Sequence, residues 1–491
     1  MAMIDVLIAG AGPTGLTLAC DLARRGVSFR LIEAVPGPRP GSRGKGVQPR
    51  TLEVFDDLGI VDRVLAHGRM AMPIRMVASD GSVTTVGVEP PRPRPDIPYP
   101  ASLITPEWRV EEALRLGGAV EVEFGTTLTG FEQTGEGVSA AVVNDGVTET
   151  ITARWLVGCD GGHSTVRKQA GIAFEGETRE EVRMIVADVA VDGLDRDSWH
   201  MWQHADGLVN LCPLPSTGVF QYQAAVAPGQ DADLRLANLQ AVLERRTGRT
   251  DIRLHAPAWS SLWRANVRLA ERYRAGRVFL AGDAAHIHSP AGGQGMNTGV
   301  QDAYNLGWKL AAGAPAALLG SYEAERRPVA AGVLALSDER LARAIEQQSI
   351  PIHRDASTTQ LAVNYCGSAL ARDDRDDTAP LRAGDRAPDA PGLATAEGER
   401  RLFDLTRGGR FTLLDFGGAP ASDGMRTFRV VADPAGPGEI ADTAGHLAAA
   451  YGAGGRTLVL IRPDGYVGLI SDAGDASAVR EYLAGIGSDA G

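Results

Sequence analysis

The stretch that decides the fold is Ile4–Glu33, IDVLIAGAGPTGLTLACDLARRGVSFRLIE, near the start of the chain. Its short apolar run Ile4–Ala9 is typical of a buried strand, and the glycines that follow break the pattern. Apolar residues at helical spacing then predict a helix over Thr14–Arg25, which Gly26 ends. Phe29–Glu33 reads as a second strand. Strand, helix and strand in this order predict a βαβ unit, and therefore a parallel, doubly wound α/β sheet.

Three glycines, Gly10, Gly12 and Gly15, stand between this strand and helix in the pattern GxGxxG. In that setting the first glycine permits a tight turn, the second lets a pyrophosphate approach the backbone, and the third lets helix and strand pack closely. The helix N-terminus offers free N–H groups to the phosphates. Glu33 ends the second strand, close to the spacing expected for a carboxylate that binds a ribose hydroxyl. The unit predicts a dinucleotide site without distinguishing FAD from NAD.

Later segments predict two further units. Proline-rich residues Pro90–Pro100 are unsuited to a helix or a central strand, so we expect an excursion between domains there. A mostly antiparallel sheet is expected from Ser82–Val88, Met184–Val191, Leu208–Leu214 and Val219–Val226, after which Arg277–Ala281 returns to the parallel sheet. A loop-like boundary at Ala383–Pro391 precedes a last unit with predicted strands at Phe411–Phe416, Thr427–Val431 and Leu458–Ile461.

Composition excludes several classes of function. The 491 residues are enough for two or three domains, and the net charge of −12 disfavours a nucleic-acid partner. The four cysteines are scattered without a CxxC, and His286-x-His288 lacks a third ligand, so no metal is expected. No stretch reaches the ~18 apolar residues of a membrane span, and the N-terminus does not resemble a signal peptide. We therefore expect a soluble, cytoplasmic protein.

Two more motifs place an acid at the end of an apolar run. Leu156–Arg167 runs into Asp160-Gly161, and Gly276–His286 runs into Gly282-Asp283. In open α/β sheets, ligands bind at the carboxyl ends of the strands, so a carboxylate there is suited to contact one.

Together these motifs resemble the group A flavoprotein aromatic hydroxylases, the family of para-hydroxybenzoate and phenol hydroxylases. GxGxxG, Asp160-Gly161 and Gly282-Asp283 occur in the family's order. The stretch His286–Ala303, HIHSPAGGQGMNTGVQDA, is similar to the hydroxylases of aromatic polyketide antibiotic pathways of the angucycline type, and Tyr322–Pro328 also fits. The resemblance spans the chain, and its last unit is similar to the thioredoxin-like domain of phenol hydroxylase.

The resemblance implies an α/β fold with three domains. Residues 1–70, 101–175 and 272–380 would form a Rossmann-like FAD-binding domain, and residues 71–100 and 176–271 an inserted, mostly antiparallel substrate-binding sheet. Residues 381–491 would form the thioredoxin-like domain. Because this domain contains no cysteine, it cannot carry out thiol chemistry, and a structural or oligomer-interface role is expected. The oligomeric state, a homodimer included, stays open.

Site roles follow from the resemblance in the same way. Asp283 would bind the ribityl chain of FAD, Glu33 the adenosine ribose and Arg43 the pyrophosphate, while Asp160 would lie near the path of FAD and NAD(P)H. Residues Pro290–Asn297 would wrap the isoalloxazine, and a helix starting near Thr298 would point its N-terminus at the ring. The full set of candidate cofactor residues is Gly10, Gly12, Pro13, Gly15, Glu33, Arg43, Arg109, Asp160, Gly282, Asp283, Pro290, Gly293, Gly295, Met296 and Asn297.

Two departures from the family affect the expected site. Family members often have Gln on the helix Ile104–Glu111, where this chain has Glu107; we expect Glu107 to point elsewhere and Arg109 to substitute. Lys45 stands where phenol hydroxylase has an aspartate that helps to deprotonate the phenol. It would favour a phenolate or enolate substrate by its charge, unless it is a solvated lysine. The candidate substrate residues are Lys45, Trp202, Tyr222 and Pro290, with plain core packing as the default for the aromatics.

The resemblance implies a monooxygenase with FAD as cofactor and NAD(P)H, NADPH favoured, as co-substrate. Reduced flavin would react with O2 to give a C4a-hydroperoxide, which transfers one oxygen atom to an aromatic or polycyclic, polyketide-like substrate. No catalytic side chain is assigned, because a substrate phenol can provide its own electron push. Two alternatives remain: an antibiotic-inactivating monooxygenase of the same fold, acting on rifamycins or tetracyclines, and a non-catalytic flavin-binding redox sensor. Baeyer–Villiger and epoxidising outcomes also stay open.

Overall fold

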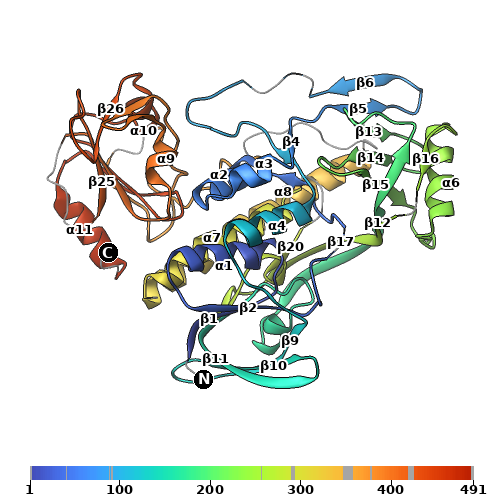
Figure 1. The fold of residues 1–491 in the computed structure, drawn as a ribbon, viewed down its shortest axis with the longest axis horizontal. Helices are drawn as coiled ribbons and strands as arrows, with labels where there is room; N and C mark the ends of the chain where they lie inside the picture. The colour runs from blue at the N-terminus through green and yellow to red at the C-terminus, as the bar shows by residue number, and fades with distance from the viewer. Residues whose placement is uncertain are drawn as a thin grey trace.

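The computed structural model describes residues 3–39, 41–87, 89, 92–255, 257–288, 293–313, 315–346, 358–375, 379–417 and 425–487. Three large sheets carry the fold, and each is backed by its own cluster of buried apolar side chains. The α/β class, with an inserted sheet and a separate C-terminal unit, is confirmed (Figure 1).

The first sheet is built on the predicted βαβ unit. Strand β1 (Ile4–Ala9) leads through α1 (Pro13–Arg24) to β2 (Phe29–Glu33), as expected from the apolar runs. Strand β1 pairs in parallel with β2 and with β11 (Val147–Gly158), and β11 pairs in parallel with β19 (Val278–Leu280). The main strand order is β18-β19-β11-β1-β2-β8, where β18 is Arg274–Ala275 and β8 is Glu123–Phe124.

Helices cover one face of this sheet, and an antiparallel meander extends from it (Figure 1). Helix α1 packs against α4 (Glu107–Gly117) and α7 (Gly295–Ala311), and α7 packs against α8 (Ala316–Glu346). The meander consists of β9 (Thr126–Gln133), β10 (Val138–Asn144) and β11, and the short helix α5 (Thr165–Gln169) lies beside it. Among the helices of the described residues, none is long and apolar enough to cross a membrane.

The inserted sheet has the order β20-β17-β12-β15-β14-β13-β5-β6, and all of these neighbours pair antiparallel except β13 with β5. The mostly antiparallel character expected from the sequence is therefore confirmed. Helix α6 (Leu236–Thr247) packs on one face of the sheet over an apolar cluster. The strands are β5 (Ile74–Val77), β6 (Val83–Val86), β12 (Phe174–Asp192), β13 (Trp199–Trp202), β14 (Val209–Pro213), β15 (Val219–Val226), β16 (Arg253–Leu254), β17 (Trp259–Ala270) and β20 (His286–Ile287).

A small three-stranded sheet ties the first two units together. Strand β3 (Gly46–Val47) pairs with β7 (Leu103–Ile104), which also pairs with β4 (Arg69–Met70). Helices α2 (Pro49–Asp57) and α3 (Val61–Leu65) follow β3. This arrangement holds the chain segment before β3 between the parallel sheet and the inserted sheet.

The C-terminal unit is a third mixed sheet in the order β21-β28-β27-β24-β25-β26-β22-β23. Its strands are β21 (Arg372–Asp373), β22 (Leu393–Thr395), β23 (Gly398–Arg400), β24 (Thr412–Asp415), β25 (Arg426–Val430), β26 (Glu439–Asp442), β27 (Leu458–Ile461) and β28 (Val467–Ser471). Helices α9 (Leu402–Thr406), α10 (His446–Tyr451) and α11 (Ala476–Gly485) accompany it. It stands at one end of the molecule, beside α2 and α7 (Figure 1).

Candidate active site

Four neighbouring parallel strands end at the same edge of the first sheet, and each delivers a motif residue there. Glu33 ends β2, Gly10 follows β1, Asp160 follows β11, and Asp283 follows β19. Because parallel strands share the direction of the chain, their carboxyl ends meet, and this edge is where open α/β sheets bind ligands. The three motifs that lie far apart in the sequence therefore form one site.

The glycine turn after β1 brings its backbone into close contact with neighbouring backbone. Gly10 has φ of +103°, and a Cβ added to it would lie 2.3 Å from the carbonyl oxygen of Cys159. A Cβ on Gly15 would lie 2.0 Å from the carbonyl oxygen of Gly10, whereas a Cβ on Gly12 would meet nothing within 4 Å. Helix α1 starts here with Pro13 in its first turn and without a side-chain cap. Its first N–H groups thus remain available beside open space.

Two of the motif carboxylates organise the loops around the edge. Glu33 accepts hydrogen bonds from the Ala11 amide at 2.8 Å and from Arg39 at 3.1 Å. Asp160 accepts from the amides of Thr165 and Val166 through one oxygen, which caps α5. Its other oxygen is buried and has no hydrogen-bond partner among the described residues. Since a buried unpaired acceptor is costly, this atom is suited to a bound ligand or water.

Asp283 follows β19 at this edge. Solvent reaches its side chain, yet surrounding protein desolvates the carboxyl and raises its pKa, against the opposing effects of His286 and Arg43. Gly282 before it has φ of +61°, and an added Cβ would lie 2.5 Å from Thr14 Oγ1, so the turn packs directly on the start of α1.

Two glutamates on α4, Glu107 and Glu111, lie close enough to influence one another electrostatically. Burial raises the pKa of Glu107, Asp283 adds to the rise, and the Gly44 amide, 2.6 Å from Glu107 Oε2, and Arg43 oppose it. Burial also raises the pKa of Glu111 to about 7, and Glu107 adds to that rise. We expected Glu107 to point elsewhere, but it faces Asp283 and Arg43. Burial is the main physical reason for the raised pKa values, and the mutual repulsion of these carboxylates adds to it.

Arg109, expected to take the place of Glu107, has partners of its own. Its guanidinium donates to Glu112 at 2.6 Å and lies 4.2 Å from the ring centre of Trp108, while its Nε is buried without a partner among the described residues. The exposed Arg43 lies on the segment between β2 and β3 and acts electrostatically on Glu107, Glu111 and Asp283.

Helix α7 points its first turn toward this region from the glycine-rich loop. It begins at Gly295 rather than near Thr298, and no side chain caps it. The buried Asn297 accepts from the Gln48 amide at 2.8 Å and donates to the carbonyls of Gly46 and Gly293, each at 2.9 Å. Gly293, Gly295 and Met296 lie beside it at the helix start, whereas Pro290 lies outside the described residues. Asn297 therefore fixes the helix start to the segment that carries Arg43 and Lys45.

His286, behind this helix start, is paired within the protein. Its Nε2 lies 2.6 Å from Asp302, whose other oxygen accepts from Arg326 at 2.7 Å. Across the described residues, no three His, Cys, Asp or Glu side chains gather in a way that could hold a metal ion.

The inserted sheet presents a polar face toward the segment that carries Arg43 and Lys45. Lys45 Nζ donates to Gln221 Oε1 at 2.5 Å and lies 4.3 Å from the ring centre of Trp199. Lys45 is half-buried, so it is not a freely solvated lysine. Asp188 on β12 stands opposite Gln221 in the register, and Asn210 on β14 accepts from Trp199 Nε1 at 3.0 Å; both are buried.

Trp202 and Tyr222, candidate substrate residues with core packing as their default, lie in the core. Both are buried in the apolar cluster under α6, and the Tyr222 hydroxyl donates to Leu239 on that helix at 3.4 Å. Side chains alternate between the two faces of a strand, so Tyr222 points away from the face that carries Gln221. Trp199 is the aromatic on the face with Lys45. The residues that sequence reasoning missed are Asp188 and Gln221.

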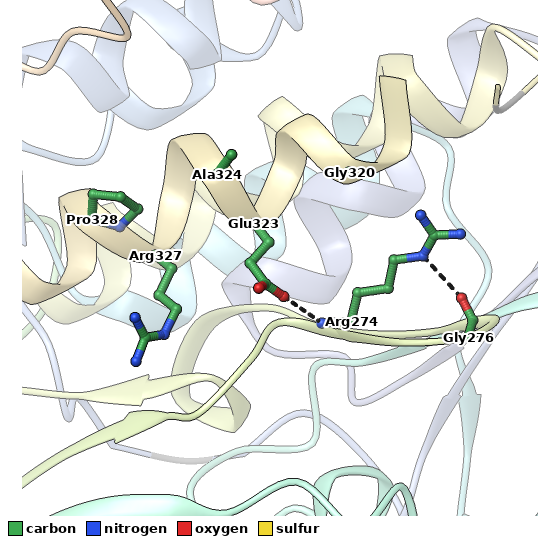
Figure 2. A pocket seen from close by; sticks show the side chains of 7 residues that line it. All are labelled: Arg274, Gly276, Gly320, Glu323, Ala324, Arg327 and Pro328. Carbon is green, nitrogen blue, oxygen red and sulfur yellow. Dashed lines mark hydrogen bonds between the residues drawn. The ribbon is translucent and has the colours of Figure 1, made fainter. Parts of the chain in front are cut away.

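A surface hollow of about 530 Å³ lies elsewhere, between α8 and the β18–β19 hairpin (Figure 2). Arg274 and Gly276, which line it, precede β19, whereas Asp283 follows β19. The hollow therefore sits at the amino end of the strand, opposite the motif edge. Arg274 and Arg327 point away from each other in Figure 2, and Glu323 between them accepts from the amides of Tyr273 and Arg274. It is no part of the candidate site.

The residues at the motif edge fit FAD. Open space in front of Gly12, uncapped starts of α1 and α7, and the exposed Arg43 suit a pyrophosphate. Acceptors on Glu33, Asp160 and Asp283 suit sugar and ribityl hydroxyls. The close carboxylates Glu107 and Glu111 are the one feature that opposes an anionic cofactor.

Comparisons with known proteins agree with this geometry. A family described as FAD binding domain matches residues 3–337, and one described as aromatic-ring hydroxylase, C-terminal, matches residues 381–488. A flavin-dependent monooxygenase of Mycobacteroides abscessus is 44% identical over 98% of this chain and 99% of its own. A 6-methylpretetramide 4-monooxygenase of Streptomyces rimosus is 36% identical over 94% of this chain and 90% of its own. The flavin-dependent monooxygenase PieE, solved with FAD and substrate, superposes with a TM-score of 0.86 at 25% identity over 99% of both chains.

Proposed function

The chain belongs to the FAD-binding aromatic-ring hydroxylases and is a flavoprotein monooxygenase, and from that premise we propose that it uses NAD(P)H and O2 to insert one oxygen atom into an aromatic or polycyclic, polyketide-like phenol. The observation that carries the proposal is the meeting of three cofactor motifs at one sheet edge, opposite the polar face of the inserted sheet. The 36% identity to a monooxygenase named for 6-methylpretetramide supports the substrate class.

Bound FAD supplies the hydride acceptor and the activation of O2, while the protein supplies placement. In our proposal the α1 N-terminus and Arg43 hold the pyrophosphate, and Glu33 binds the adenosine ribose. Asp283 binds the ribityl chain. Helix α7, fixed at its start by Asn297, directs the positive end of its dipole at the ring, which stabilises negative charge on reduced flavin. Residues 71–100 and 176–271 form the substrate-binding unit.

On the substrate side, we assign Lys45 to an anionic oxygen of the substrate. Its ammonium lies over the Trp199 ring and donates a hydrogen bond to Gln221. A phenolate beside this charge is favoured over the neutral phenol, because an opposite charge within a few ångströms lowers the pKa of the acid. An ionised phenol is also the more electron-rich ring. The site needs no carboxylate base to activate such a substrate.

The experiment is consumption of O2 and NAD(P)H by the purified holoenzyme with a panel of polyketide phenols, with the products weighed by mass spectrometry. Coupled consumption and a product heavier by one oxygen atom are expected, with NADPH used faster than NADH. Oxidation of NAD(P)H that no phenol stimulates, or peroxide release without any oxygenated product, would contradict the proposed function. A drug-inactivating role would instead show as loss of antibiotic activity in the oxygenated product.

A further inference from the structure

One short segment, Ser42–Lys45, carries side chains to both halves of the site. Arg43 faces the cofactor edge, where it acts on Glu107 and Asp283, and Lys45 lies on the inserted sheet over Trp199. The segment is neither helix nor strand, so it depends on other elements for its shape. The Gly44 amide donates to Glu107 at 2.6 Å on the cofactor side.

On the substrate side, Gln221 is committed to this segment through both ends of its amide. Its Nε2 donates to the Ser42 carbonyl, and its Oε1 accepts from Lys45 at 2.5 Å and from Gln223 at 3.0 Å. The ammonium can only donate and the carbonyl can only accept, so these partners fix which end of the amide faces which. A rotated amide would lose both bonds, which makes Gln221 a rigid support for the Lys45 charge.

Asp188 holds the same segment from the neighbouring strand, where it stands directly opposite Gln221 in the register. One of its oxygens accepts from the Ser42 amide at 2.8 Å, and the other is buried without a partner among the described residues. The residue is 3% exposed, and burial raises the pKa of its carboxyl to about 6, with Lys45 and the Ser42 amide opposing the rise. A half-satisfied buried carboxylate costs stability, so packing alone does not account for Asp188 beside Lys45.

We propose that Asp188 and Gln221 are positioning residues that set where Lys45 presents its charge to the substrate. Gln221 places the ammonium on the Trp199 ring through a direct hydrogen bond, and Asp188 anchors the segment through the Ser42 amide. The inference rests on the proposed function, in which Lys45 binds an anionic oxygen of the substrate. The same segment also carries Arg43. Asp188 and Gln221 therefore support both the Lys45 charge that faces the substrate and the Arg43 charge that faces the cofactor edge.

Asp188 has two effects of opposite sign on Lys45, and substitutions separate them. Asp188→Asn keeps an acceptor for the Ser42 amide and removes a negative charge near Lys45, so an anion at Lys45 is held more tightly. Asp188→Ala removes the acceptor as well, so the segment loses its anchor and the anion is held less tightly. Gln221→Leu, similar in size, removes the support of the ammonium. A residue that only stabilised the fold would weaken binding in every variant.

The experiment uses the FAD-loaded enzyme and 4-nitrophenol as a coloured probe of phenolate binding. Difference absorbance against pH yields the pKa of the bound probe and its dissociation constant. We expect the wild type to lower the pKa of the bound probe below that of the free probe. Asp188→Asn should lower it further and tighten binding on the order of threefold. Asp188→Ala and Gln221→Leu should return it toward the free value, with affinity weakened about tenfold. Asp192→Asn, an exposed position on the same strand, is the matched control and should match the wild type.

The outcomes separate this inference from the proposed function. If Lys45→Met leaves the pKa of the bound probe unchanged, or the wild type does not bind the probe, the assignment of Lys45 to an anionic substrate oxygen is wrong. The positioning role of Asp188 and Gln221 is then wrong as well. If Lys45→Met abolishes the shift but Asp188→Asn and Asp188→Ala change it in the same direction or not at all, the assignment of Lys45 stands and the positioning role is overturned. Flavin content and melting temperature are measured for each variant, and the Asp188→Asn result decides where Asp188→Ala does not fold.

Discussion

At the scale of single residues, Glu111 stands out because it lies one helical turn from Glu107 on α4, in a site assigned to an anionic cofactor. Burial first, and then Glu107 and Glu33, raise its pKa to about 7, although Arg39 and Arg43 oppose the rise. The group is therefore partly protonated at neutral pH before any cofactor binds. A carboxyl in this state can release its charge to accommodate a pyrophosphate.

We predict that the apoprotein binds FAD more tightly as the pH falls from 8 to 6. Protonation of Glu111 removes a negative charge beside the proposed pyrophosphate position, and the binding of an anion raises the pKa of a neighbouring acid further. The dependence is at most about tenfold in the dissociation constant per pH unit. Glu111→Gln should bind FAD as tightly at pH 8 as the wild type does at pH 6 and show a flat profile. Fluorescence titration of FAD measures both, and Glu121→Gln, an exposed position beyond the end of the same helix, should retain the wild-type slope.

Residue identities at the site were predictable where a motif ends a strand and not where two distant segments meet. Glu33, Asp160 and Asp283 could be placed from the sequence because each follows an apolar run. Asp188 contacts Ser42 across 146 positions, and Gln221 does so across 179. Alternation shows that Tyr222 and Gln221 face opposite sides of β15, but only tertiary packing decides which side α6 covers. That missing information is the reason why the sequence alone leaves Tyr222 and Trp202 among the candidate substrate residues.

At the scale of elements, α7 and α8 are joined to the C-terminal sheet by a buried group of charges. Arg462, at the end of β27, donates to Glu325 on α8 at 2.7 and 2.9 Å and to Asp464 at 2.6 Å. Lys309 on α7 donates to Glu325 at 2.7 Å. Burial would raise the pKa of Glu325, but Arg462 and Lys309 hold it well below its ordinary value. The two cations and two anions balance, which is how charges are tolerated without solvent.

We predict that Glu325→Gln destabilises the protein by about 3–5 kcal/mol, because it leaves two buried cations, Arg462 and Lys309, against the single carboxylate of Asp464. The matched control is Glu339→Gln on the same helix, where the ion pair with Arg343 is exposed and should contribute less than about 1 kcal/mol. Urea denaturation monitored by circular dichroism compares the two variants. Equal losses in both would show that the buried group contributes no more than a surface pair.

Elements with regular apolar patterns were predicted well, and long polar strands were not. Ile4–Ala9, Phe29–Glu33 and Val219–Val226 were expected as strands and are confirmed at the same bounds. Strand β12 begins at Phe174, ten residues before the expected Met184, because its first half is charged and largely exposed. That half is held by pairing with β17, a contact that leaves no periodic apolar signal in the sequence.

At the scale of the whole molecule, one helix spans the distance between the cofactor edge and the C-terminal unit. Helix α7 has 17 residues, roughly 25 Å at 1.5 Å per residue, with Asn297 at its start. Near its end, Trp308 is 2% exposed, shares an apolar cluster with Leu458 and Leu460 of the C-terminal sheet, and lies 5.7 Å from the ring of Phe411, centre to centre. The C-terminal unit therefore supports the far end of the helix whose start is assigned to the flavin. This gives a cysteine-free, thioredoxin-like unit a structural role.

If α7 joins the two units rigidly, cofactor release and loss of the C-terminal interface occur together. We predict one thermal transition in which flavin fluorescence, which reports FAD release, and the Trp308 signal, obtained by difference from Trp308→Phe, share a midpoint. Added FAD should shift both, since a ligand at 100 times its dissociation constant contributes about 2.7 kcal/mol to the folded state. Trp199→Phe, on the inserted sheet, provides the comparison signal. A Trp308 transition that FAD does not move would mean that the C-terminal unit unfolds independently, and α7 would then not transmit the stability of the cofactor site to it.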